Sequence, residues 1–272
     1  MRAVTFASGS GGNCALVSDG GTHILIDAGI SMRRITASLK ELGLSTGDVA
    51  GVLITHEHRD HTAALAMMAK RGCLRVFAPR TVANHLCWGS ADMQKIISVI
   101  PAGEPFMLGG LSVTAFRTSH DTDESVGYRI SGSAEFGFCT DTGCVTEDML
   151  RALRGVDAAV IEANHDEDML RCGSYPYQLK RRILSDRGHL SNEASARLAA
   201  ELCSAGAGKL ILAHLSRENN RPDAALRTVS EHLARRGLCP EIAVAPENGL
   251  CSVEFEGRER SCWPSGSSAA AG

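Results

Sequence analysis

The stretch "GVLITHEHRDHT" (residues 51–62) places an apolar run directly before a cluster of histidines and acids. The apolar run predicts a buried strand, and residues two apart at its end point the same way. One metal ion can therefore take His56 and His58, and a second can take Asp60 and His61 once the chain turns. Imidazole and carboxylate are the ligands expected for Zn²⁺, Mn²⁺ or Fe²⁺. The alternative, a His-rich surface loop, leaves the apolar strand in front of the cluster unexplained.

Three further apolar runs lead into a residue that can bind a metal ion. His120 ends "LSVTAFRTSH", Asp141 ends "EFGFCTD", and His214 follows "KLILA". Taken singly, each residue can be a capping Asp or a His that is satisfied in the core or in a loop. Taken together, they place ligands at the ends of apolar strands, as a pair of metal ions requires. We therefore predict that they complete the site.

Short apolar runs alternate with amphipathic stretches along the whole chain. The runs predict strands at 14–18, 23–29, 51–56, 74–79, 96–100, 111–120, 125–131, 135–141, 156–164, 209–216, 241–246 and 250–255. The amphipathic stretches predict helices at 61–72, 81–89, 146–155, 175–186, 191–206 and 221–237. Strands cluster and helices follow, and the pattern occurs twice. The expected fold is α/β, with two packed sheets and helices on their outer faces.

Length and composition are those of a globular protein. The chain has 272 residues, 44% of them apolar and 22% charged, and a formal net charge of -3. We expect one domain over residues 1–260 and a disordered tail over 261–272. No run is long and apolar enough for a membrane span, and the N-terminus turns polar too early for a signal peptide, so we expect a cytoplasmic protein. The ten cysteines form no CxxC pair, which predicts reduced thiols, mostly buried.

The segment "THEHRDH" resembles the HxHxDH signature of the metallo-β-lactamase superfamily, and the later ligand residues match that superfamily's motifs in order. The resemblance implies an αββα sandwich with two divalent ions. One ion would be held by His56, His58, His120 and Asp141. The other would be held by Asp60, His61, Asp141 and His214, with Asp141 bridging. It further implies that Asp60 takes part in catalysis.

Four more segments resemble the YycJ/WalJ branch of bacterial metallohydrolases: "ASGSGGN", "NHDEDML", "YPYQLKRRILSDRGHLSNE" and "HLSRENN". This resemblance covers about residues 3–255. It implies a two-metal phosphodiesterase that acts as a DNA exonuclease, 5′ to 3′ on double-stranded DNA, in DNA repair. Two alternatives stay open: a hydrolase of small phosphodiesters or other esters, and a catalytically weak regulatory partner of a signalling system. The oligomeric state is left undetermined.

His189, in "GHLS", resembles the additional histidine of the superfamily's nuclease branches. The resemblance implies that it binds the scissile phosphate or protonates the leaving oxygen. The alternative is a histidine that only starts a helix. Asp27 and His165 are expected to lie beside the metals and to hold a loop or a ligand by hydrogen bonds.

Substrate contacts are expected from two kinds of segment. The basic residues Lys180, Arg181 and Arg187 surround "GHLS" and can contact phosphates. The alternative is a solvated helix face on which Arg182 pairs with Asp186. The remaining expected contacts are Ser10 and Asn13, in a Gly-rich loop, and Asn219.

Overall fold

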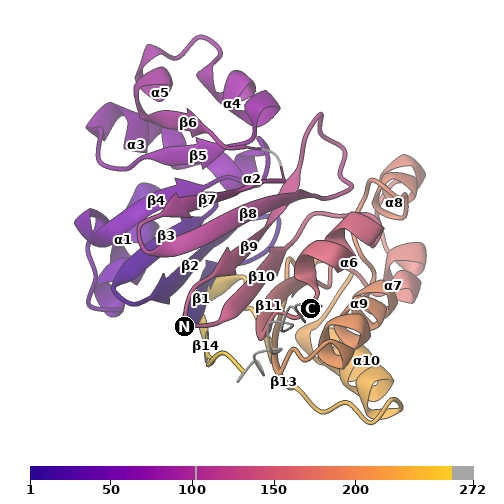
Figure 1. Cartoon of the computed structure of the whole chain (residues 1–272). Helices are drawn as coiled ribbons and strands as arrows, with labels where there is room; N and C mark the ends of the chain where they lie inside the picture. The colour runs from indigo at the N-terminus through magenta and orange to yellow at the C-terminus, as the bar shows by residue number, and fades with distance from the viewer. Residues whose placement is uncertain (102, 259–272) are drawn as a thin grey trace, which may run out of the picture.

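The computed structural model describes residues 1–101 and 103–258, and the predicted tail at 261–272 lies outside these residues. Within the described residues, two seven-stranded sheets pack face to face (Figure 1). Helices cover the outer face of each sheet, so the layers run helix, sheet, sheet, helix. The predicted αββα architecture is confirmed. The assignment of residues 1–260 to one domain stays a prediction.

The first sheet is mixed. Its spatial order is β14 (Asn248–Glu254), β1 (Arg2–Ala7), β2 (Cys14–Asp19), β3 (Thr22–Ile26), β4 (Val49–Leu53), β5 (Val76–Ala78) and β6 (Ile97–Val99). Strands β14 to β3 pair antiparallel, and β3 to β6 pair parallel. The end of β4 that carries the histidine cluster therefore lies in the parallel part.

The second sheet has the same mixture. Its spatial order is β13 (Glu241–Val244), β12 (Lys209–Ala213), β11 (Ala158–Glu162), β10 (Glu135–Cys139), β9 (Val126–Ser131), β8 (Leu111–Arg117) and β7 (Pro105–Leu108). Strands β13 to β10 are parallel, and β10 to β7 are antiparallel. Because β10, β11 and β12 are parallel neighbours, the residues at their carboxyl ends lie along one edge of the sheet.

The helices separate into two groups. Those that accompany the first sheet are α1 (Met32–Glu41), the 3₁₀ turn η1 (Thr46–Asp48), α2 (Arg59–Thr62), α3 (Leu65–Arg71), α4 (Arg80–Cys87) and α5 (Ala91–Ile96). Those that accompany the second sheet are α6 (Glu147–Leu153), α7 (Glu167–Cys172), α8 (Tyr177–Ile183), α9 (Asn192–Ser204) and α10 (Pro222–Ala234). Among the described residues, none of these helices is both long and apolar enough to cross a membrane.

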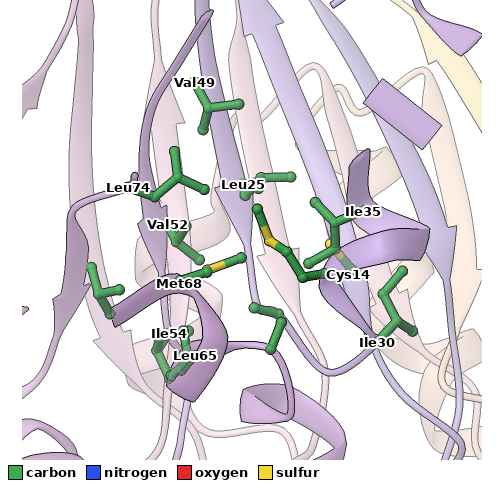
Figure 2. Close-up of a cluster of buried hydrophobic side chains, with 14 of the residues drawn as sticks. Cys14, Leu25, Ile30, Ile35, Val49, Val52, Ile54, Leu65, Met68 and Leu74 are labelled. Carbon is green, nitrogen blue, oxygen red and sulfur yellow. The ribbon is translucent and has the colours of Figure 1, made fainter. Parts of the chain in front are cut away.

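Within the described residues, three apolar cores stabilise the packing of the four layers. Figure 2 shows the core under the first sheet's helices, where Ile35 of α1 and Met68 of α3 lie against strand residues such as Leu25 and Val52. The other two cores fill the space between the sheets and the space between the second sheet and its helices. Burial of this apolar surface drives the layering. Between the sheets, the buried Tyr128 hydroxyl donates to the Ile54 carbonyl oxygen at 2.5 Å, just before the histidine cluster.

Several predicted helix ends are confirmed. The side chains of Thr146 and Ser191 cap α6 and α9, and Gly72 ends α3 with a left-handed φ of 57°. The prediction of one helix over 61–72 is wrong, because α2 and α3 are separate. The Ala64 amide, at the break, donates to the Ala28 carbonyl oxygen.

Six elements were not predicted: β1, β7, α1, η1, α5 and α7. All of them except α1 are too short, or too buried on both faces, to show a clear period. Helix α1 did carry a signal, since Ser31 caps it and Ile35 and Leu39 are buried at helical spacing.

The cysteines only partly match the prediction. The nine that the structure describes are all free thiols, but only Cys14 and Cys139 are buried. The prediction that most are buried is wrong, because Cys87, Cys172 and Cys203 sit at or near the ends of surface helices.

Candidate active site

Three histidines from two different segments meet at the first ligand group. One ring nitrogen from each of His56, His58 and His120 lies within 4.8 Å of the others. His56 and His58 follow β4, while His120 follows β8 of the facing sheet. The Nε2 atom of His56 is buried and has no hydrogen-bond partner in the part of the chain that the structure describes. Burial lowers the pKa of His56 well below its usual value, which keeps the ring in the neutral form that binds metal ions.

A second ligand group lies beside the first. Ligand atoms of Asp60, His61 and His214 also lie within 4.8 Å of one another. Asp60 and His61 are in α2, and His214 follows β12. Side chains from both sheets therefore converge at the same edge, as the two-ion prediction requires.

Asp141 lies between the two groups. Its Oδ2 atom is 3.4 Å from His61 Nε2, and its Oδ1 atom is 3.3 Å from His214 Nε2 and 3.9 Å from His120 Nε2. Oδ2 is buried and accepts no hydrogen bond within the described residues. Burial raises the pKa of Asp141, but the surrounding imidazoles outweigh it and hold that pKa well below its ordinary value. A buried carboxylate and imidazole nitrogens without partners fit divalent cations.

The backbone is strained at three positions in or beside these groups. Asp27, Asp141 and His214 have φ values of 60°, 57° and 58°, and they are the only non-glycine residues with positive φ in the described chain. Such a conformation costs about 1–3 kcal/mol and persists only where neighbours enforce it. At His214 the amide donates to Ser8 Oγ at 2.7 Å. The strain is confined to the residues that turn the chain at the sheet edge.

Asp27 lies beneath the second ligand group, as predicted for a supporting residue. Its carboxylate accepts from the Thr55 amide at 2.9 Å and lies 2.7 Å from His61 Nδ1. This contact leaves His61 Nε2 to face Asp60 and Asp141. Asn13, predicted as a substrate contact, is buried instead among the ligands. Its Oδ1 atom accepts from the Gly9 amide at 2.8 Å and lies 3.1 Å from His214 Nδ1.

Backbone contacts clamp the histidine cluster in place. The Asn13 amide donates to the Asp60 carbonyl oxygen at 2.7 Å, and the Ala28 amide donates to the His61 carbonyl oxygen at 2.8 Å. A Cβ atom at Gly29 would lie 1.6 Å from the Asp60 carbonyl oxygen. Glycine is therefore required at position 29 for this close approach.

His189 is paired with a residue that the sequence analysis missed. Its Nδ1 atom is 2.6 Å from Glu162 Oε1, and Glu162 Oε2 accepts from the Thr142 amide at 2.8 Å. Glu162 is fully buried and is the last residue of β11. A carboxylate at the end of an apolar strand is the same signal that identified Asp141, so it was available in the sequence.

The Glu162 contact sets the state of the His189 ring. Burial lowers the pKa of His189, but the charge and hydrogen bond of Glu162 outweigh it and raise that pKa to about 9. Because Nδ1 is held by the carboxylate, Nε2 is left to face incoming molecules. One ligand atom each of Asp141, Glu162, His189 and His214 lies within 4.8 Å of the others, so His189 adjoins both ligand groups.

The predicted basic patch divides into engaged and free side chains. Lys180 donates to the Arg171 and Gly173 carbonyl oxygens. Arg187 donates to the carbonyl oxygens of His120 and Thr122 at 2.9 and 2.6 Å. Both side chains therefore tie segments together, and their contacts with phosphate stay a prediction.

The two neighbouring arginines behave differently from each other. Arg182 pairs with Asp121 and not with Asp186, and this pair ties α8 to the loop of His120. Arg181 is exposed and lies over the Tyr177 ring. Of the predicted basic contacts, Arg181 is the one whose guanidinium has no hydrogen bond or ion pair among the described residues.

The other predicted residues lie at different depths. Ser10 is exposed and lines a cavity of about 200 Å³ that also contains His189 and His214. Asn219 is buried, and its contact with substrate stays a prediction. His165 is buried, neither of its ring nitrogens has a hydrogen-bond partner among residues 1–101 and 103–258, and burial lowers its pKa to about 4. A larger hollow of about 650 Å³, elsewhere on the surface, contains none of the predicted site residues.

Comparisons with known proteins agree with this arrangement. The family model described as "Beta-lactamase superfamily domain" matches residues 22–215. Exodeoxyribonuclease YycJ of Bacillus anthracis is 37% identical over 241 residues, which cover 85% of this chain and 89% of YycJ. Exodeoxyribonuclease WalJ of Streptococcus pneumoniae is 34% identical over 241 residues, which cover 85% of this chain and 88% of WalJ. Zn²⁺-bound PqqB from Methylobacterium extorquens has a TM-score of 0.69 at 18% identity, covers 94% of this chain and 100% of PqqB, and shows the shared fold.

The αββα fold and the ligand cluster at its edge define a metal-dependent hydrolase. This chain belongs to the metallo-β-lactamase superfamily and, within it, to the YycJ/WalJ branch. The superfamily membership implies divalent metal ions at the site.

Proposed function

We propose that this protein cleaves phosphodiester bonds of nucleic acid and that it degrades DNA from an end. The observation that carries the proposal is the pair of His189 and Glu162, set beside the two ligand groups. Two relatives that match most of the chain are named exodeoxyribonucleases, which supports DNA as the substrate.

We assign the seven ligand side chains to two ions, Zn²⁺ or Mn²⁺, with Fe²⁺ as a further candidate. His56, His58 and His120 would hold one ion, Asp60, His61 and His214 would hold the other, and Asp141 would contact both. When bound, such a pair lowers the pKa of water and offsets the negative charge of the scissile phosphate. We propose that Asp60, whose carboxylate is partly exposed, holds the attacking water.

His189 supplies the proton that the leaving oxygen needs. The water oxygen forms a bond to phosphorus as the bond from phosphorus to the leaving oxygen breaks. The His189 proton goes to the leaving oxygen, and the proton lost by the water restores His189 afterwards. Glu162 keeps the imidazole oriented and stabilises its charged form through Nδ1.

The finer assignments rest on the resemblance to the YycJ/WalJ branch. We propose the 5′ to 3′ direction, double-stranded DNA and a role in DNA repair. In the alternative, the same residues hydrolyse small phosphodiesters, and only the substrate that enters the site differs.

An assay with the purified protein separates these readings. Duplex DNA, single-stranded DNA and RNA, each labelled at the 5′ or the 3′ end, are incubated with Mn²⁺, with Zn²⁺ or with a chelator. We expect immediate release of a labelled mononucleotide from 5′-labelled duplex, a shortening ladder from 3′-labelled duplex, and neither with the chelator. Hydrolysis of bis-p-nitrophenyl phosphate with all nucleic acids left intact would exclude the nuclease.

A further inference from the structure

The cavity beside His189 has a feature that the metal site does not explain. It is a hollow of about 200 Å³, and one of its walls comes from α8 and the turn before it. That wall presents Tyr175, Leu179 and Ile183. Water and phosphate need no apolar wall. A second group of the substrate, with an apolar face, fits this wall.

The volume limits what can enter. Pockets for drug-sized ligands measure about 300–1,000 Å³, so a hollow of this size takes one compact group and no stretch of duplex. A nucleoside is such a group, and its base can lie flat against an aromatic ring. Ser10 and Ser216 line the same cavity and offer hydroxyls to a sugar.

The cavity lies on the side of the site where the leaving group of the reaction would sit. His189 and His214 line it, whereas His56, His58 and His61 do not. Because His189 delivers a proton to the leaving oxygen, the group next to His189 is the leaving group. In 5′ to 3′ degradation with cleavage of the bond from phosphorus to O3′, the leaving group is the terminal nucleotide, whose sugar and base lie on that side of the scissile bond.

We propose that this cavity is the subsite for the terminal nucleoside of the strand, with Tyr175 and Leu179 as the residues that recognise its base. The inference rests on the proposed function and names the part of the substrate that the site reads. Base stacking on an aromatic ring tolerates every base, so the subsite favours the presence of a base and no particular sequence.

Arg182 holds two walls of the cavity together. It lines the opening, and its guanidinium pairs with Asp121, which lies 3.3 Å from His120 Nε2. The α8 wall is thereby held against the loop that carries a metal ligand. Tyr177, two residues after Tyr175, is 73% exposed and does not line the cavity, which makes it a matched control.

The test compares two duplexes that differ only at the 5′ terminus. One ends in an ordinary nucleotide, and the other ends in a nucleotide whose base is replaced by hydrogen. We expect wild-type kcat/KM to be about tenfold higher for the terminus with a base, the typical worth of one stacked base. Leu179→Trp, which fills the cavity, should lower cleavage of the terminus with a base more than cleavage of the baseless terminus, so that the preference for a base is lost. Tyr175→Ala should shrink the preference, and Tyr177→Ala should keep it.

A binding measurement separates this inference from the proposed function. Calorimetric titration with deoxythymidine monophosphate, at equal metal content, should show binding to the wild type and to Tyr177→Ala and none to Leu179→Trp. If the wild type cleaves DNA without regard to the terminal base, the subsite is wrong and the nuclease stands. If no DNA is cleaved but the nucleotide binds to the wild type and to Tyr177→Ala and not to Leu179→Trp, the nucleotide subsite is supported and the proposed nuclease activity is wrong. Equal nucleotide binding by Leu179→Trp and wild type overturns the subsite.

Discussion

The first sheet supplies four of the seven candidate ligand side chains from the single loop and short helix after β4, whereas the second sheet supplies its site residues from separate segments. His120, Asp141 and His214 follow three different strands, and Glu162 ends a fourth. The first contribution depends on one local turn. The second depends on the register of parallel strands, which brings the ends of β10, β11 and β12 together.

The site residues from the two sheets also differ in their burial and in the kinds of group they bring to the site. His56 and His61 of the first sheet's loop are fully buried, while the His189 side chain is 21% exposed. His189, its carboxylate partner Glu162 and most of the cavity lining belong to the second sheet's side of the site, while Ser10 comes from the loop after β1. The loop after β4 thus supplies only candidate metal ligands, whereas the second sheet's side combines three such ligands with His189, Glu162 and most of the cavity lining.

The largest effect is expected where the two contributions meet. Asp141→Asn removes the charge that contacts ligands from both sheets, so cleavage should fall below detection and at least one ion should be lost. Asparagine tolerates the left-handed φ of 57°, so the fold should be retained. Metal analysis and thermal unfolding check both points. A variant that keeps both ions and full activity contradicts the bridging role of Asp141.

A smaller effect, confined to the second sheet's side, is expected from His189→Ala. Loss of a positioned acid should lower the rate by about 10²–10⁴-fold with metal content unchanged. Glu162→Gln should lower it less, because the imidazole remains and loses only its charged partner. Rates at saturating substrate and metal analysis of the same samples provide the measurement. Loss of an ion from the His189 variant would place His189 among the ligands.

The smallest effect is expected on substrate binding at the surface. Arg181→Ala should weaken DNA binding and lower the slope of log affinity against log salt by about 1, as for one lost phosphate contact. Arg187→Ala is the matched comparison, because its donors are held by the His120 and Thr122 carbonyls. It should instead lower the unfolding temperature and keep the salt slope. If both variants change the salt dependence of DNA binding equally, Arg181 and Arg187 do not differ in their contact with phosphate.

The clustering of the candidate ligands could be predicted from sequence because each comes after an apolar run at a strand end. Glu162 carried the same signal, but a carboxylate inside the predicted strand 156–164 was treated as part of that strand. The two sheets and most helices followed from apolar patterns that match the layers. The short helices α5 and α7 gave too few turns for a period to show.

Partners of the polar side chains could not be predicted in the same way. Arg187 and Lys180 were expected to contact phosphates because they are basic and close to His189 in sequence. Arg187 instead meets carbonyl oxygens 65 and 67 positions away. Asn13 was assigned to substrate from its Gly-rich loop, yet it contacts His214, 201 positions away. Such contacts depend on the packing of distant loops, which local composition does not encode.

The close approach at Gly29 has a consequence for engineering. The loop after β4 is held by the backbone of residues 9–13 and 27–29, and no side chain larger than hydrogen fits at position 29. A designer who grafts "THEHRDH" alone onto another scaffold would transfer the ligands without the clamp that orients them. The smallest transplantable unit of this half of the site is therefore three loops that are far apart in sequence.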